Sequence, residues 1–432
     1  MTAAKARGKH AFINIPEEAV LETIPSFKDP AALADLDGTF DRLRSVCPVY
    51  RSDELRMVLV TGYEHVLEVL RDPERFPSKN SLKTAGGKPQ PQVAEVLSEA
   101  FPYVDTLIAT DGPRHAHHAG LIKSFLTKQR MRDYEEPFRT LTEDILDAIE
   151  VNSPVEFVDE FSLPLTIGIL CLFTGVPAER AALVKRSSDA EVNLLGAIGT
   201  VEQNVANARA IVEMQNVLTD LIARRLDKPA DDLISHIVHS SPPDGLAQLT
   251  LPEQVMILRG VVLGGNETTR GLINAMVYKL CQEPELMKRL DSDARAFDNF
   301  IDEGLRHTSP VIMLFRRVAY DTEIGGVPVT KGELIGVSYG AANHDAARFQ
   351  CPHAWDLDRP AVTRHLAFGF GTHYCVGSPI AKLEAKIALR CILDRYERLE
   401  LAPDEEPRFM PSFMVRQMDS LKVICRLSRA GT

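Results

Sequence analysis

The chain has 432 residues, and 45% of them are hydrophobic, which allows a large core and excludes disorder over most of the length. Its 49 Lys and Arg residues against 60 Asp and Glu residues give a formal net charge of −11, which argues against nucleic acid and anionic membranes as general partners. The longest apolar stretches, 165–176 and 255–263, are too short or too interrupted to span a bilayer.

The first residues and the cysteines indicate a reducing, cytoplasmic environment. Residues 1–10 carry charges, and no apolar segment of a secretory signal follows them. The seven cysteines are odd in number and widely spaced, which fits neither a disulfide framework nor a structural zinc site. We therefore expect a soluble cytoplasmic protein with a single domain over 1–432, in which residues 1–20 form an N-terminal extension.

The predicted elements begin with a small mixed region. Residues 57–61 have the apolar pattern of a strand, and residues 63–70 have the spacing of a helix. Residues 78–92 are rich in Gly, Pro and Lys, which predicts an exposed, mobile loop. From 93 to 281 the pattern is helical, with one break at 239–251.

A helix that crosses the protein interior is predicted after Thr250. Thr250 and Glu253 can form a capping box, and residues 255–263 are apolar on nearly all sides. Strand-like runs follow at 322–329 and 334–337, and a final helix follows at 377–397. The expected fold class is mainly α with a small β-rich subregion.

Two glycines at the centre of this interior helix need an explanation. Gly264 and Gly265 each cost about 0.8–1 kcal/mol relative to alanine in a helix. A glycine pair lets a flat cofactor approach the backbone, and Thr268 can bond the carbonyl of Gly264, which bends the helix and opens a small pocket. Close packing of another helix is the alternative.

One cysteine has an unusual setting. Cys375 lies in the segment FGFGTHYCVG, residues 368–377, just before the final predicted helix. Glycines allow positive φ and close approach of a large group, and a helix N-terminus favours a thiolate. On these grounds alone, a metal-ligating thiolate and a glycine-rich turn around a core cysteine both remain open.

The whole ten-residue pattern resembles the haem-binding loop of the cytochrome P450 family. Glu303 and Arg306 are similar to the family's Glu-x-x-Arg pair, and residues 343–359 are similar to its meander, with His344 where arginine is more usual. Residues 264–269, GGNETT, resemble its acid-alcohol motif. The resemblance spans about residues 58–423 and implies the cytochrome P450 fold and a haem-thiolate monooxygenase.

The resemblance implies a role for each motif residue. The iron of haem b is ligated by Cys375, Thr268 acts on the oxygen side, and Glu267 relays protons with water. The other residues implied to hold the haem and its propionates are His115, Arg317, His373, Phe368, Gly369, Gly377, Gly264 and Gly265.

One position departs from the family's pattern. Four residues after His115 the family usually has a propionate-binding arginine, and this chain has Ala119. His118 lies on the same helical face and is one substitute. A solvent-exposed pair of His117 and His118 is the alternative.

The resemblance also implies a lipophilic substrate, such as a terpenoid, steroid, fatty acid or aromatic compound, over the distal face of the haem. Such sites bind mainly by burying apolar surface, worth about 25 cal/mol per Å². The implied lining residues are Val261, Gly264, Thr268, Ile312, Met313, Leu314, Phe413 and Met414. Ordinary core packing is the alternative for each of them.

Electrons are implied to come from a ferredoxin and its ferredoxin reductase, with O2 as co-substrate, because no flavin or iron–sulfur module follows the last predicted strand. Basic residues in two segments expected on the cysteine side could steer an acidic partner, and they are Lys123, Lys128, Arg130, Arg132, Lys382 and Lys386. An ordinary solvated basic face is the alternative. The competing functions are a peroxide-driven peroxygenase and a haem-thiolate binding or sensor protein.

Overall fold

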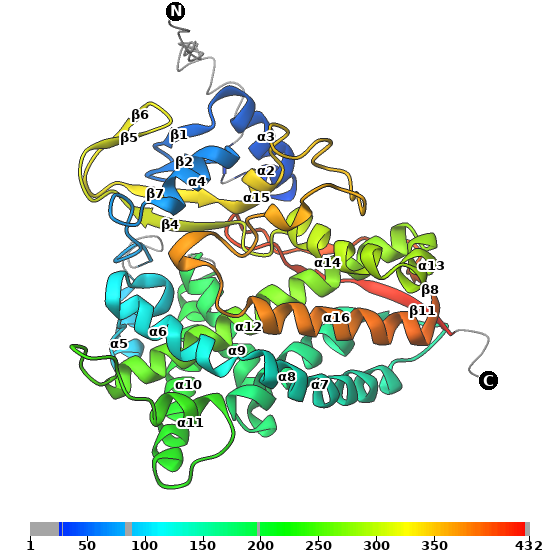
Figure 1. Ribbon diagram of the computed structural model, residues 1–432, viewed down its shortest axis with the longest axis horizontal. Coiled ribbons are helices and arrows are strands. Elements are labelled where there is room, and N and C mark those ends of the chain that lie inside the picture. Colours follow the sequence, from blue (N-terminus) through cyan, green and yellow to red (C-terminus); the bar gives the residue numbers. More distant parts are fainter. Residues whose placement is uncertain (1–25, 28, 83–88, 197–198, 428–432) are drawn as a thin grey trace, which may run out of the picture.

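The computed structural model describes residues 26–27, 29–82, 89–196 and 199–427, so the expected N-terminal extension, 1–20, lies outside the described residues. Helices fill most of the molecule, and the strands gather into small sheets (Figure 1). The fold class expected from the residues is therefore confirmed. None of the helices in the described ranges is long and apolar enough to cross a membrane.

The largest sheet has four strands in the order β1-β2-β7-β4. These strands are Val49–Ser52, Met57–Val60, Leu334–Ser338 and Met313–Arg317. β2 runs parallel to β7, whereas β1 and β4 are antiparallel to their neighbours. Val58 and Val337 belong to one apolar cluster, and Leu59 and Met313 belong to another. Successive residues of a strand point to opposite faces, so each side chain of β4 belongs to one face of this sheet.

The remaining strands form three smaller sheets. One has the order β3-β11-β8, with strands Pro154–Glu156, Lys422–Leu427 and Tyr396–Leu401. Two pairs complete the set, β5 (Thr322–Ile324) with β6 (Val327–Val329) and β9 (Arg408–Phe409) with β10 (Met418–Ser420). The run predicted over 322–329 is thus two strands, because Gly325 and Gly326 turn the chain with φ of 53° and 83°.

Helices surround the sheets. Beside the largest sheet lie α2 (Pro30–Ala34), α3 (Leu36–Val46), α4 (Tyr63–Arg71) and α15 (Tyr339–Asn343) (Figure 1). The others are α5 (Pro91–Leu97), α6 (Gly112–Phe125), α7 (Lys128–Ala148), α8 (Leu163–Thr174), α9 (Ala181–Leu195), α10 (Val201–Asp227), α11 (Leu233–Val238), α12 (Leu251–Gln282), α13 (Glu285–Ser292), α14 (Ala294–Thr308) and α16 (Ser378–Arg395).

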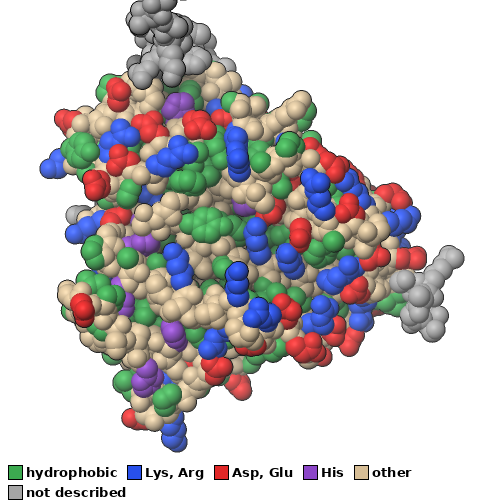
Figure 2. Space-filling model, viewed as in Figure 1, with side chains coloured by type: hydrophobic (Ala, Val, Ile, Leu, Met, Phe, Trp, Pro, Cys, Tyr) green, Lys and Arg blue, Asp and Glu red, His purple; other side chains and the backbone are tan. Residues whose placement is uncertain are grey.

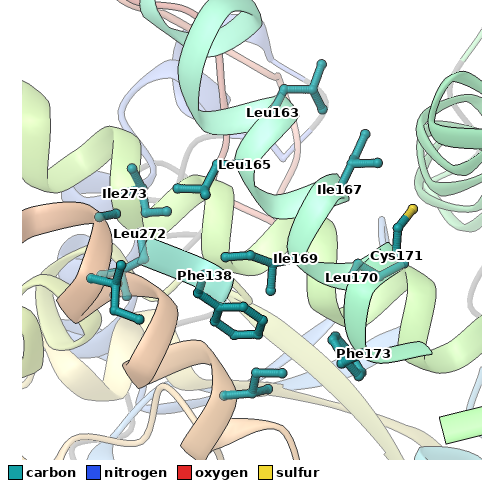
Figure 3. Packing of buried hydrophobic residues seen from close by; sticks show 14 of the residues in the cluster. Phe138, Leu163, Leu165, Ile167, Ile169, Leu170, Cys171, Phe173, Leu272 and Ile273 are labelled. Atoms are coloured by element: carbon teal, nitrogen blue, oxygen red, sulfur yellow. The ribbon is translucent and has the colours of Figure 1, made fainter. Parts of the chain in front are cut away.

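The interior helix α12 forms as predicted. The capping box of Thr250 and Glu253 is present, and most of its side chains from Gln254 to Leu280 are buried. α8 is apolar on all sides because α12 and α7 cover it, and Figure 3 shows side chains of α8 and α12 meeting Phe138 of α7 in this core. Packing rather than amphipathic patterning therefore stabilises these two helices.

Two sequence expectations need correction. The loop over 78–92 is not exposed throughout, because Ser78 and Ser81 are only 0% and 1% exposed and Pro91 begins α5, while residues 83–88 lie outside the described residues. The final helix ends at Arg395, two residues early, because Tyr396 begins β8. The cysteines are all free, as expected.

Candidate active site around Cys375

Cys375 lies in a tight loop between the short 3-10 helix η5, Gly371–His373, and α16. Its backbone N–H donates to the carbonyl of Phe368 at 2.9 Å. Gly369 and Gly371 both have φ of 70°, which side chains rarely adopt, and a Cβ at Gly377 would lie 3.8 Å from the sulfur of Cys375. The glycines thus shape a loop that leaves Cys375 exposed.

The loop alone does not make Cys375 a thiolate. Although Cys375 is exposed to solvent, the surrounding protein atoms partly desolvate its sulfur and raise the pKa of its thiol, and the backbone N–H groups of Gly377 and Ser378 offset that rise only in part. These N–H groups lower the pKa, as expected of a helix N-terminus, but by less than desolvation raises it in the polypeptide without a ligand. A metal bound to the sulfur would supply the missing stabilisation of the charged form.

Different features of the structure explain why each of the two central residues of α12 is a glycine. A Cβ at Gly264 would meet nothing within 4 Å, and this residue is exposed although most of the helix around it is buried. A Cβ at Gly265 would lie 3.0 Å from Leu170 of α8. Open space explains Gly264, and close helix packing explains Gly265.

Thr268 behaves as the sequence predicts. Its hydroxyl donates to the carbonyl of Gly264 at 2.6 Å, one turn earlier. α12 nevertheless remains helical without interruption through this point. Thr268 is partly exposed, so its hydroxyl lies beside the open space at Gly264.

Glu267, in contrast, is buried in a polar network. Its carboxylate accepts hydrogen bonds from Asn266 at 2.9 Å, from Arg270 at 2.8 Å and from Gln417. Burial raises its pKa, and the charge of Arg270 offsets that rise only in part. Gln417, 150 residues further along the chain, carried no recognisable signal in the sequence.

Two of the predicted propionate ligands lie together. The rings of His115 and His373 are 4.0 Å apart. Nε2 of His373 contacts the carboxylate of Asp111 at 3.1 Å and the hydroxyl of Ser78 at 3.2 Å. The Nδ1 atoms of both rings are buried and have no hydrogen-bond partner among the described residues, so they are free to bind an added acceptor or donor.

The third predicted ligand, Arg317, does not join them. Its guanidinium donates to the carbonyls of Asn80 and Gly332. The neighbouring residue Arg316 is 5% exposed. Burial is the main reason that the pKa of His115 is lowered to about 4, and the charge of Arg316 contributes to this lowering. Arg316 and Arg317 are adjacent on β4 and point to opposite faces of the sheet, and it is the charge of Arg316 that acts on His115.

Ala119 has no basic side chain, so it cannot take the place of the arginine that the family usually has at this position. His117 and His118 are 6% and 0% exposed, so the solvent-exposed alternative is wrong. Nδ1 of His118 accepts from the backbone N–H of Leu107 at 3.3 Å, and its Nε2 has no partner among the described residues. His118 therefore anchors the η1 turn, Leu107–Ala109, to α6.

The expected substrate-lining residues divide into two groups. Val261, Gly264, Thr268, Leu314 and Phe413 are partly or fully exposed. Ile312, Met313 and Met414 are 1%, 0% and 8% exposed and belong to one apolar cluster, against which Phe413 also packs. Core packing thus accounts for these three, although the backbone of Met414 does lie beside Ile312, whose N–H it accepts at 2.8 Å.

The Glu303–Arg306 pair is the centre of a buried network. Both side chains are 0% exposed, and Arg306 donates to the two carboxylate oxygens at 2.7 and 2.9 Å. Arg306 also donates to carbonyls of the meander, and Arg359 donates to Glu303 at 2.9 Å. The pair therefore holds the meander, and Arg359 is a third member that the sequence pattern did not single out.

The basic residues expected on the cysteine side are partly neutralised. Lys382 pairs with Asp302 at 2.5 Å, Lys386 with Asp298 at 2.7 Å and Arg130 with Asp231 at 2.7 Å. Lys123, Lys128 and Arg132 are exposed. Figure 2 shows Lys and Arg side chains gathered over this face, with carboxylates between them.

A haem fits these residues. An exposed thiol at Cys375 faces backbone N–H groups, and Gly264 offers open space in a buried helix. His115 and His373 leave buried nitrogens for carboxylates, beside the buried charge of Arg316. Each donor type suits one part of the cofactor, namely the iron, the flat ring and the propionates.

Comparisons with known proteins agree with this site. A family model described as Cytochrome P450 matches residues 197–424. The chain is 31% identical to cytochrome P450 107B1 of Saccharopolyspora erythraea, over 91% of this chain and 96% of that protein. It is 30% identical to the 6-deoxyerythronolide B hydroxylase of the same organism, over 93% and 99% of the two proteins.

Solved structures of cytochrome P450 proteins are also similar to this chain. The structure of cytochrome P450 CREJ in complex with (4-ethylphenyl) dihydrogen phosphate superimposes with a TM-score of 0.85 at 25% identity, over 90% of this chain and 97% of that one. The chain therefore belongs to the cytochrome P450 family, as a monooxygenase of the bacterial type.

Proposed function

We propose that this chain hydroxylates a small to medium lipophilic substrate, with O2 and two electrons from a ferredoxin. The observation that carries the proposal is the exposed Cys375 in a loop whose backbone N–H groups face its sulfur. Bound haem b supplies oxygen activation, which a sulfur ligand promotes. Residues 1–432 act as one catalytic domain in this proposal.

The side chains of this protein bind and position the reactants and move protons. Cys375 ligates the iron, and His115, His373 and Arg316 hold the propionates. Thr268 presents its hydroxyl on the oxygen side, where the open space at Gly264 admits a small ligand. Glu267, the next residue along the helix, relays protons with water in this proposal, and burial raises the pKa of its carboxyl group.

A lipophilic substrate is supported by the expected lining residues that are apolar and only partly buried, namely Val261, Leu314 and Phe413. Relatives include a 6-deoxyerythronolide B hydroxylase and steroid C26-monooxygenases. The candidate classes for this chain are terpenoids, steroids, fatty acids and aromatic compounds. Optical titration of the ferric protein with one compound of each class, watching for displacement of the iron-bound water, identifies the class that binds.

The function is tested by supplying electrons in two ways. With a bound substrate, NADH, ferredoxin reductase and ferredoxin should yield hydroxylated product, whereas hydrogen peroxide alone should yield little. Product only with peroxide would favour the peroxygenase, and NADH consumption without product under any condition would favour a binding or sensor protein. The exposed lysines and arginine at positions 123, 128 and 132 support an acidic donor protein.

Replacing Thr268 with valine should uncouple electron use from product. Valine has the same shape but lacks the hydroxyl that bonds Gly264, so proton delivery loses its last positioned donor. Because positioned acids contribute roughly 10² to 10⁴ in rate, product per NADH should fall about tenfold or more while substrate titration is unchanged. The matched control is Thr269→Val, a buried neighbour that is 3% exposed. Equal coupling in both variants would exclude this role.

We expect Arg316, rather than Arg317, to hold the haem. Arg316→Gln should speed the transfer of haem to an apo-globin acceptor roughly tenfold to hundredfold, because a hydrogen bond to a charged group contributes about 1.5–3 kcal/mol. Arg317→Gln, whose guanidinium bonds only Asn80 and Gly332 among the described residues, is the control and should release haem at the normal rate. The reverse order would restore the original sequence prediction.

A further inference from the structure

A second cluster of histidines lies away from Cys375, between α3, α14 and the meander. The rings of His307 and His344 are 5.2 Å apart, and those of His344 and His353 are 4.9 Å apart. One ring nitrogen of His344, one of His353 and one carboxylate oxygen of Asp37 all lie within 4.8 Å of one another. Two imidazoles and a carboxylate are a donor set that first-row divalent metals bind.

Each of the two histidines is held through another contact, as metal ligands usually are. Nδ1 of His344 lies 3.1 Å from the carbonyl of Gly340 and 3.7 Å from a carboxylate oxygen of Asp37, and Nε2 of His353 lies 2.5 Å from a carboxylate oxygen of Asp41. Contacts of this kind to a backbone carbonyl or a carboxylate orient ligand histidines and set their tautomer. His307 adds a third contact, through its Nε2, to the carbonyl of His353 at 3.1 Å.

One nitrogen in the cluster is left over. His344 is only 1% exposed, yet its Nε2 has no hydrogen-bond partner among the described residues. A buried polar atom without a partner costs about 1–3 kcal/mol, so a ligand that binds it is stabilising. This observation is independent of the spacing of the three side chains.

Asp37 can accept a further partner although it is already paired. Arg416 donates to both carboxylate oxygens of Asp37, at 2.5 and 2.9 Å, and each oxygen keeps a second lone pair for another partner.

Access is available from solvent. The side chain of His353 is 46% exposed and that of Asp37 is 27% exposed, whereas His344 forms the buried end of the cluster. An ion can therefore enter from the surface without opening the core. At the fourth position a water molecule would complete a tetrahedral site.

We propose that Asp37, His344 and His353 bind one divalent first-row metal ion, with Zn²⁺ as the probe. The ion joins α3 to the start of the meander and is separate from the haem. Nothing in this proposal depends on oxygenase activity.

The test uses the whole holoprotein without a histidine tag, treated with EDTA and then dialysed against a small excess of Zn²⁺ in the presence of Mg²⁺. Elemental analysis should find one zinc per chain in addition to the haem iron. Crystals measured at the zinc absorption edge should show anomalous density between these three side chains.

Variants separate a metal site from a structural contact. His353→Ala and Asp37→Asn should lose the zinc, and Asp41→Asn, which removes only the supporting contact, should weaken binding roughly 10- to 100-fold. The control His239→Ala removes an exposed histidine elsewhere and should keep full binding. Zinc content unchanged in His353→Ala, no retained zinc in the wild type, or anomalous density elsewhere would each overturn the proposal.

Discussion

Replacing Cys375 with serine is expected to abolish both product formation and the red-shifted absorption of the reduced protein under carbon monoxide. That absorption is typical of thiolate coordination. Serine has a hydroxyl in place of the thiol, and this hydroxyl remains protonated at neutral pH, so the variant offers the iron no thiolate. The loop already holds the sulfur where Gly377 and Ser378 direct their N–H groups, and burial alone would keep the thiol neutral. In the proposed site, iron would stabilise the charged form of the sulfur, so the spectrum should require the cysteine.

The control for this variant is Cys351→Ser. Cys351 is also an exposed free cysteine, but it lies in the meander rather than in the glycine loop. This variant should keep the absorption and the activity of the wild type. Retention of the red-shifted band in Cys375→Ser would contradict the assignment of the iron ligand, whereas its loss in both variants would indicate damage to the fold.

Replacing Arg306 with alanine is expected to cause the largest loss of stability. The change leaves the carboxylate of Glu303 buried with Arg359 as its remaining guanidinium partner. It also removes the Arg306 bonds to the carbonyls of Asn343, Pro352 and Ala354, of which Ala354 keeps a bond from Arg359. Breaking a buried ion pair costs about 3–5 kcal/mol, against a total stability of about 5–15 kcal/mol. Urea unfolding followed by far-ultraviolet circular dichroism should show the midpoint fall sharply or the protein fail to fold.

The control is an arginine with similar bonds at the surface. Arg289 donates to both oxygens of Asp358, at 2.7 and 2.8 Å, but its side chain is 41% exposed. Arg289→Ala should leave the unfolding midpoint nearly unchanged, because water replaces an exposed partner. Equal losses in the two variants would show that burial is not what makes the Glu303–Arg306 pair important.

Patterns within a few residues were predictable because helix geometry places their partners. The capping box of Thr250 and Glu253, the bond from Thr268 to Gly264 and the pair of Glu303 and Arg306 all join residues three or four positions apart. The glycine loop around Cys375 was equally readable, because its positive φ angles require glycine. These short-range patterns were enough to identify the fold class and the family, and they are the basis of the proposed iron ligand and oxygen side.

Contacts between distant segments were not predictable in the same way. Gln417 reaches Glu267 across 150 residues, and Ser78 is buried because it meets Asp111 and His373. The pairing register of β4 decides that Arg316, not Arg317, faces His115, and a single residue of register reverses every side chain. Local spacing carries no information about which distant side chains converge or how deeply they are buried, and burial controls the pKa values of Cys375 and Glu267.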